Sequence, residues 1–407
     1  MRQETSVPTH VPAHLIIDFD IYRPFDRDPS CSPGDYHEPF ARLQRKAVPP
    51  IFWSPHNGGH WVVTRQRLLS QIFADHRNFP SDYVVVPKER RAPAGFRQLP
   101  IQANPPEHAA YRALFASAFT QPAIKRREAD VRSLARSLIG ELAPKGRCDF
   151  ARDFAKHLPI RVFLGMVGIP ETDRLKLTDI AERIFRATGE PRTSAFRELG
   201  EYLGREIDGR SEGHGADLIS KIINSNVGDS RVSRKDAIGV LSVLMAAGLD
   251  TVASMSSFIM RFLAINPAHR RALTRDPALI PAATEEFLRR FALLNAGRVV
   301  AKDITVNDVL MKEGDMVMLP TTFGAFDSEA YEDPASVNFQ RKSPQSLTFG
   351  HGIHGCPGNM LARMEIRVTL EEWLPRIPEF ELDPQSPPIV HTGTSGTITS
   401  LCLVWPT

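Results

Sequence analysis

The sequence predicts a mainly α-helical protein, and two observations support this. Residues 123–225 follow helical periodicity with mixed charged faces. Residues 233–265 form the longest apolar stretch, with Ser233 and Asp236 placed to cap its start and Asn266-Pro267 placed to end it. At 1.5 Å per residue this second helix would be roughly 50 Å long.

The composition is that of a globular protein without a nucleic-acid partner. Of the 407 residues, 42% are hydrophobic and 24% are charged, and the net charge of +3 is too small to indicate nucleic-acid binding. The four cysteines, Cys31, Cys148, Cys356 and Cys402, are scattered without a CxxC pair, which is typical of a reducing compartment. Residues 1–13 lack the apolar core of a signal peptide. We therefore expect a soluble, cytoplasmic protein.

The apolar helix at 233–265 is long enough to span a membrane, which is the alternative to a core helix. Asp250 lies near its middle, and a carboxylate there would cost about 2.5–3.5 kcal/mol in a bilayer centre. We therefore expect a helix buried through the centre of the protein, and no membrane association.

Short strands and one long loop complete the pattern. Residues 50–53 and 60–64 flank Asn57-Gly58-Gly59 and predict a β-hairpin, followed by a short helix over 65–75. Residues 76–103 predict a long proline-containing loop, which in a compact protein usually carries function. Further strands are predicted at 298–301, 304–306 and 316–319, with a turn at Glu313-Gly314, and a hairpin over 397–404.

A helix start is predicted after this loop. Asn104 is placed as the N-cap, Pro105 as the first helical residue and Glu107 as the third. His108 and Arg112 follow four residues apart, so they share one face of that helix. Taken alone, such a pair is more often two solvated polar residues.

The stretch 349–358 concentrates the unusual chemistry of the chain. It holds four glycines in ten residues, which favours close approach of the backbone to a large or flat group. Cys356 lies among them just before a helical pattern, where the helix macrodipole favours a thiolate. A lone cysteine cannot form a structural zinc site, but it can be the axial ligand of a haem. The alternative is a glycine-rich turn with a buried, inert cysteine.

The pattern Phe349-x-x-Gly352-x-His354-x-Cys356-x-Gly358 resembles the haem-binding loop of the cytochrome P-450 (haem-thiolate) monooxygenases. Segments 104–112, 247–251 and 286–289 resemble three further motifs of that family, in family order. The likeness is to the soluble bacterial camphor-hydroxylase type. It implies one triangular, mainly α domain over 1–407 with a small β-rich lobe, although length alone would suggest two or three domains.

The resemblance implies haem b as the cofactor and assigns residues to it. Cys356 would be the iron ligand, and the cofactor-binding residues would be His108, Arg112, Arg298, His354, Phe349 and Gly358, the first four on the propionates. On the central helix Thr251 and Asp250 would deliver protons, and Gly248 would permit a local opening of that helix. The alternative for Thr251 is a hydrogen bond to its own i−4 carbonyl.

Two further sets of residues are implied in the same way. Glu286 and Arg289, one helical turn apart, would form the family's structural pair with Arg341 as third member. The substrate pocket would be lined by Phe96, Val243, Ala246, Ala247, Leu293, Leu294 and Ile398. Phe96 stands where camphor-hydroxylating relatives place a tyrosine, so a ketone loses one hydrogen-bond donor. Ala296 departs from an aspartate that these relatives carry beside the propionate arginine.

The implied reaction is hydroxylation of a small apolar cyclic substrate, a terpenoid or norisoprenoid ketone, with O₂. Electrons would come from NADH through a separate flavin reductase and a 2Fe–2S ferredoxin, because no Rossmann fingerprint is present. Arg112 and Arg363 would form part of the ferredoxin dock on a monomer. Two alternatives remain: a peroxygenase or isomerase of the same fold, and a non-catalytic haem-thiolate binding or sensing protein.

Overall fold

The computed structural model describes residues 7–23, 35–46, 48–88, 96–186, 190–210, 215–342 and 345–407. Cys31 and part of the predicted loop 76–103 lie outside the described residues. The chain divides into two compact units. Unit 1 comprises Met1–Arg91, Glu286–Cys356 and Val390–Gly396, and unit 2 comprises Ala92–Glu285, Pro357–Ile389 and Thr397–Thr407.

Unit 1 is built around a four-stranded sheet in the order β1-β2-β9-β6. Asn57, Gly58 and Gly59 have left-handed backbone angles that form the turn between β1 and β2, so the predicted hairpin is confirmed. The sheet contributes to an apolar core that includes Trp53 and Trp61. Its elements are α1 (Glu38–Arg45), β1 (Ile51–Ser54), β2 (His60–Val63), α2 (Gln66–Ala74), β6 (Asn295–Val299), β7 (Ile304–Val306), β8 (Val309–Met311), β9 (Met316–Pro320) and α12 (Thr321–Ala325).

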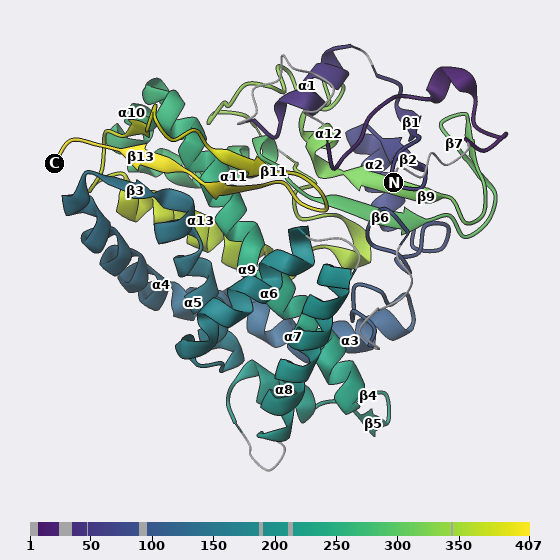
Figure 1. The fold of residues 1–407 in the computed structure, drawn as a ribbon, viewed down its shortest axis with the longest axis horizontal. Coiled ribbons are helices and arrows are strands. Elements are labelled where there is room, and N and C mark those ends of the chain that lie inside the picture. The colour runs from purple at the N-terminus through teal and green to yellow at the C-terminus, as the bar shows by residue number, and fades with distance from the viewer. Residues whose placement is uncertain are drawn as a thin grey trace. The chain divides into compact units, whose positions relative to one another are not determined.

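Unit 2 holds most of the helices, as Figure 1 shows. Its elements are α3 (Glu107–Ala116), α4 (Gln121–Leu142), β3 (Arg147–Asp149), α5 (His157–Val167), α6 (Arg174–Arg186), α7 (Glu190–Asp208), α8 (Leu218–Ile223), β4 (Asn226–Val227), β5 (Ser230–Arg231), α9 (Arg234–Ile265), α10 (Pro267–Arg275), α13 (Asn359–Trp373), β10 (Glu381–Leu382), β12 (Thr397–Ser400) and β13 (Cys402–Val404). The unit boundary falls within α11 (Ile280–Arg290) and β11 (Ile389–His391).

The predicted central helix is confirmed as α9. The Ser233 hydroxyl accepts from the Asp236 N–H at 3.1 Å, and the helix ends at Ile265 before Asn266. Within the described residues, α9 is the helix long and apolar enough to cross a membrane, and 67% of its apolar window is buried. That burial is typical of the core helix of a folded protein.

Two local predictions are wrong. Helix α3 begins at Glu107, two residues after the predicted start at Pro105, and the Asn104 carbonyl oxygen accepts from the His108 N–H at 3.1 Å. Residues 397–404 do not pair with each other as a hairpin, because β13 pairs with β10 and β3. At 397–404 long-range strand pairing, rather than the local pattern, decides the hydrogen bonding.

Candidate functional site

The segment 349–358 folds as a compact loop that leads into α13. The Cys356 N–H donates to the Phe349 carbonyl oxygen at 2.8 Å, which closes the loop on itself. Gly358 then occupies the N-cap of α13, so Cys356 lies three residues before the helix begins, as predicted. The cysteine is half-buried. Cys148, in contrast, is buried, and burial raises the pKa of its thiol. Cys148 therefore fits the description of a buried, inert cysteine.

Two glycines give this loop its shape. Gly350 and Gly352 have φ of 68° and 71°, in the left-handed region that favours glycine. A Cβ atom on Gly352 would lie 2.9 Å from both the Ala74 Cα and the Phe73 carbonyl oxygen of α2. Gly352 therefore serves the packing of the loop on α2 as well as its turn.

His354 is held by a residue that sequence reasoning missed. The ring Nε2 lies 2.6 Å from the hydroxyl oxygen of Ser81, which is 1% exposed. Ser81 comes from the proline-containing loop, 273 residues away in the chain. The sequence around Ser81 does not predict this contact, because it forms only in the tertiary structure.

Arg298 is a buried cation on β6. It is 4% exposed, and its guanidinium donates to the Gly297 carbonyl oxygen at 2.7 Å and lies 5.5 Å from the centre of the Phe73 ring. Burial lowers its pKa to about 10. Among the described residues no carboxylate forms an ion pair with it. A buried guanidinium without a carboxylate partner is stabilised by binding an anion from outside the chain, and a haem propionate is such an anion.

His108 and Arg112 lie four residues apart on α3, as predicted. His108 is buried, and Arg112 is half-buried with its guanidinium 5.8 Å from the centre of the Phe115 ring. Arg363 on α13 donates to Glu285 at 2.6 and 3.1 Å. This ion pair compensates the charge of Arg363 and weakens its predicted contribution to a docking surface.

An accessible stripe runs along the middle of the otherwise buried α9. Val243, Ala246 and Thr251 are half-buried and Ala247 is exposed, whereas Leu244, Met245 and Leu249 beside them are buried. The accessible positions follow the helical period, so they share one face of α9. Small, mostly apolar side chains that stay accessible on a core helix are typical of a ligand-facing surface.

Asp250 and Thr251 lie on this central turn. Asp250 is 5% exposed. The Thr251 hydroxyl donates to the Ala247 carbonyl oxygen at 3.1 Å, which is the hydrogen bond to the i−4 carbonyl given above as the alternative for Thr251. The predicted opening of the helix at Gly248 is wrong, because α9 is continuous. A Cβ atom on Gly248 would lie 2.7 Å from the Phe163 ring, so the glycine admits a ring from α5.

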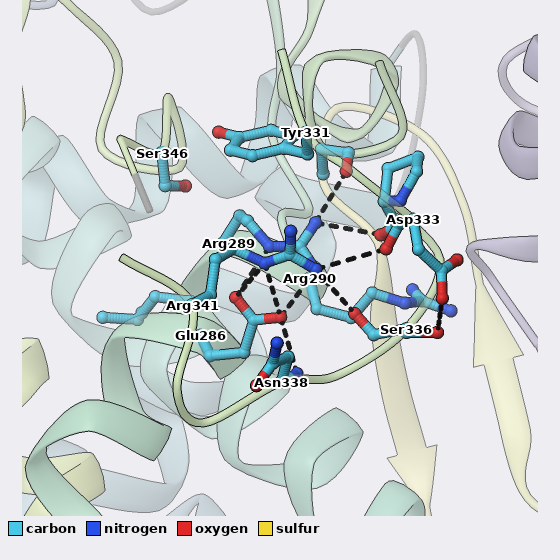
Figure 2. Close-up of polar contacts among 12 residues, drawn as sticks. Glu286, Arg289, Arg290, Tyr331, Asp333, Ser336, Asn338, Arg341 and Ser346 are labelled. Atoms are coloured by element: carbon cyan, nitrogen blue, oxygen red, sulfur yellow. Dashed lines mark hydrogen bonds and ion pairs between the residues drawn. The ribbon is translucent and has the colours of Figure 1, made fainter. Parts of the chain in front are cut away.

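The side chains of Glu286, Arg289 and Arg341 form a cluster in unit 1, in which Glu286 and Arg289 are buried and Arg341 is half-buried (Figure 2). Arg289 is fully buried, and its five N–H groups donate to Glu286, Ala325, Pro334 and Ser336 at 2.8–2.9 Å. Burial acts to raise the pKa of Glu286, but the hydrogen bond and charge of Arg289 outweigh it and hold that pKa below its usual value.

This cluster lies beside the approach to the cysteine loop. Thr348, the residue before Phe349, donates its hydroxyl to the Leu288 carbonyl oxygen of α11. Arg341 donates to both carboxylate oxygens of Glu286 at 3.1 Å. The three predicted members are therefore in contact, and they join α11 to the chain that precedes the loop.

The remaining predicted pocket residues are packed within their own units. Phe96 is 7% exposed, and a Cβ atom on Gly200 of α7 would lie 2.8 Å from its ring. Ile398 on β12 and Leu293 are buried, and Leu294 is half-buried and forms a β-bridge with Ser395. Phe96, Ile398 and the α9 stripe belong to unit 2, whereas Leu293, Leu294, Arg298 and the cysteine belong to unit 1.

Comparisons with known proteins agree on one family. The family model described as Cytochrome P450 matches residues 195–400. Probable cytochrome P450 127A1 of Sinorhizobium fredii (strain NBRC 101917 / NGR234) is 30% identical over 404 residues, covering 98% of this chain and 97% of the relative. Vitamin D3 dihydroxylase of Streptomyces griseolus is 29% identical over 348 residues, covering 82% of this chain and 85% of the relative.

Solved structures are similar over nearly the whole length. The crystal structure of CYP101J2 aligns with a TM-score of 0.90 and 39% identity, and that of CYP101C1 with 0.88 and 33%. Each alignment covers 99% of this chain and 100% of the other. The predicted mainly α fold with a small β-rich part is confirmed. With a matching family model and relatives aligned from end to end, the chain belongs to the cytochrome P450 family.

Proposed function

We propose that this cytochrome P450 hydroxylates a small apolar cyclic substrate, a terpenoid or norisoprenoid ketone, with O₂ and electrons from NADH. The observation that carries the proposal is the accessible stripe of α9, where small apolar side chains precede Asp250 and Thr251. Membership of the family makes the protein a monooxygenase with haem b as its cofactor. We propose that residues 1–407 act as one such domain, since relatives align along nearly all of it.

The residues fit haem. Cys356 is a half-buried thiol just before a helix N-terminus, which suits a thiolate that would bind the haem iron. Arg298 is a buried cation that a propionate would neutralise, with His354, His108 and Arg112 as the further propionate contacts. Phe349 and Gly358 bracket the cysteine loop. Bound through a thiolate, haem supplies O₂ activation, and electron donation from the sulfur favours O–O cleavage.

The chain's own residues bind the substrate and handle protons. The face of Val243, Ala246 and Ala247 offers apolar contact, and Phe96 supplies a ring without a hydroxyl donor. Asp250 is a buried carboxyl that can hold a proton and pass it to the Thr251 hydroxyl. For that, Thr251 must release the Ala247 carbonyl oxygen, a weak helix back-bond.

Phe96 and its neighbours set the substrate class in this proposal. A ketone oxygen buried without a partner costs about 1–3 kcal/mol, so a camphor-sized ketone should bind loosely. The small side chain of Ala246 leaves room on the accessible face of α9. A larger ring system such as an ionone gains apolar contact and can place its oxygen elsewhere.

A 2Fe–2S ferredoxin with a separate NADH-dependent reductase is the proposed electron source, on a soluble, cytoplasmic monomer. Half-buried Arg112 supports an electrostatic dock, whereas Arg363 is compensated by Glu285. A peroxygenase would have no need of a buried acid beside Thr251, and Asp250 therefore favours the ferredoxin-dependent reaction.

The test is spectroscopic and catalytic. The reduced, CO-bound protein should show the strongly red-shifted Soret band of thiolate ligation, and Cys356→His should lose it. A spectrum like that of a histidine-ligated globin would contradict the proposed ligand. Adding β-ionone should shift the ferric iron toward high spin, and turnover should yield hydroxylated ionone. A spin shift without product would favour a binding or sensing protein.

A second experiment addresses the proton path. Thr251→Ala should still consume NADH in the reconstituted system, but much of the electron flow from NADH should reduce O₂ to hydrogen peroxide instead of forming product. Asp250→Asn should slow turnover. If both variants couple NADH to product as the parent does, these residues have no part in the reaction.

A further inference from the structure

A chain of two hydroxyl groups ends on the carboxylate of Asp250. The Ser254 Oγ, one helical turn further along α9, lies 3.4 Å from the Asp250 Oδ2 and 2.6 Å from the Thr397 Oγ1 on β12. Asp250, Ser254 and Thr397 are 5%, 1% and 4% exposed. The three groups all belong to unit 2.

Ser254 behaves differently from another buried serine of the same helix. Ser257 donates to the Ala253 carbonyl oxygen at 2.8 Å, which is the usual choice of a serine within a helix. Ser254 instead contacts a side chain on β12 and the carboxylate on its own helix. Its hydroxyl thus links two elements that are far apart in the sequence.

The number of hydroxyl hydrogens determines which group donates in each of these two hydrogen bonds. A serine hydroxyl has one hydrogen, so Ser254 can donate to only one of its two neighbours. An ionised carboxylate is the stronger acceptor, so Ser254 donates to Asp250 and Thr397 donates to Ser254. When Asp250 carries a proton, it can donate to Ser254 and the direction reverses. The pair therefore accommodates both protonation states of the acid.

We propose that Ser254 and Thr397 are positioning residues that hold the Asp250 carboxyl in the orientation from which it serves Thr251. The contact to Asp250 is long, at 3.4 Å, so the carboxyl can leave and return. Thr397 is itself buried, so the chain orients the acid instead of conducting protons to solvent. This inference rests on the proposed proton-delivery role of Asp250.

The experiment compares variants that delete and variants that keep the hydroxyls. Ser254→Ala and the isosteric Thr397→Val should each raise the amount of hydrogen peroxide formed from O₂ per NADH consumed by roughly 3–10-fold during turnover of β-ionone with a 2Fe–2S ferredoxin and its reductase. Each should also change the solvent deuterium isotope effect on product formation. Thr397→Ser, which keeps the hydroxyl, should behave like the parent. Ser257→Ala, the matched buried serine, should also behave like the parent.

The outcomes separate this inference from the proposed function. Parent-like coupling and isotope effect in Ser254→Ala and Thr397→Val, with uncoupling in Asp250→Asn, would overturn the positioning role and leave the acid in place. Parent-like coupling in all three would remove Asp250 itself from the mechanism. If Ser254→Ala does not fold, Thr397→Val against Thr397→Ser decides the question. Equal uncoupling in Ser257→Ala would mean general damage to α9 and would likewise overturn the inference.

Discussion

Arg289 donates to both carboxylate oxygens of Glu286, at 2.8 and 2.9 Å, and both side chains are excluded from solvent. Figure 2 shows Arg341 beside the same carboxylate. Removing one partner of a buried pair leaves an uncompensated charge, which costs about 3–5 kcal/mol. The preceding residue, Glu285, forms a pair with Arg363 in which both side chains are over 30% exposed. The partly exposed Glu285–Arg363 pair is therefore a control for the buried Glu286–Arg289 pair.

We predict that Glu286→Gln lowers the free energy of unfolding by about 3–5 kcal/mol. It should also lower the fraction of purified protein that carries haem, because the cluster adjoins the approach to the cysteine loop. Denaturant unfolding and the ratio of Soret to protein absorbance measure the two effects. Glu285→Gln should cost less than about 1 kcal/mol. Equal losses in both variants would contradict the distinction.

Arg298→Met should release haem faster than the parent protein. A hydrogen bond to a charged group contributes about 1.5–3 kcal/mol, so release should be roughly 10–100-fold faster, measured by transfer of haem to apomyoglobin. The haem-free variant should be no less stable than the haem-free parent, since an uncompensated cation has left the interior. Arg271→Met on the surface of α10 is the control. Unchanged haem release in Arg298→Met would exclude a propionate contact.

Acid should weaken the packing of α13 on α4 through Glu372. This carboxylate is 3% exposed; burial acts to raise its pKa, but hydrogen bonds from Arg136 and Arg132 outweigh it and lower the pKa to about 2, from a usual 4.5. Because the folded pKa is the lower one, the stabilisation is present above about pH 4.5 and is lost as the pH falls toward 2.

Glu372→Gln should therefore lower the free energy of unfolding at pH 7 by about 1–3 kcal/mol and flatten its decline between pH 5 and 3. Urea unfolding at a series of pH values measures both effects. Glu141→Gln, an exposed residue of α4, should leave the curve unchanged. Parallel curves for the parent and Glu372→Gln would show that this carboxylate does not carry the acid sensitivity.

Phe96→Tyr should restore a donor for a ketone in the substrate pocket. A net hydrogen bond is worth about 0.5–1.5 kcal/mol, so camphor should bind roughly 2–10-fold more tightly and give fewer products, while ionone changes less. Spectral titration and product analysis measure these effects. Phe119→Tyr adds a hydroxyl at a half-buried position of the same core and is the control. If camphor affinity and product distribution stay as in the parent, Phe96 only packs against α7.

Arg112→Ala should slow electron transfer from the ferredoxin. Raised salt should likewise slow the parent, because screening weakens attraction between exposed charges. Stopped-flow reduction at two ionic strengths tests this, with the haem content of each preparation measured alongside to separate a propionate effect from a docking effect. Salt-independent reduction of the parent protein would argue against an electrostatic dock.

Local sequence patterns alone were sufficient to predict several of the main elements. The ends of α9, the β1–β2 hairpin and the helix after Cys356 follow from caps, turn residues and helical periodicity, which act within a few residues. The grouping of Glu286, Arg289 and Arg341 came from the family resemblance, and the structure brings the three together.

What only the tertiary structure decided depends on residues far apart in the chain. The contact of His354 with Ser81, the packing of Gly248 on Phe163 and the link from Ser254 to Thr397 join segments whose sequences carry no sign of one another. Caps, turns and periodicity act over one or two helical turns, whereas burial and hydrogen-bond partners are set by whichever segments fold against them. The sequence by itself therefore determined the family, the thiolate candidate and the central helix. The tertiary structure determined which hydroxyls and cations surround them, because those contacts exist only once the chain has packed.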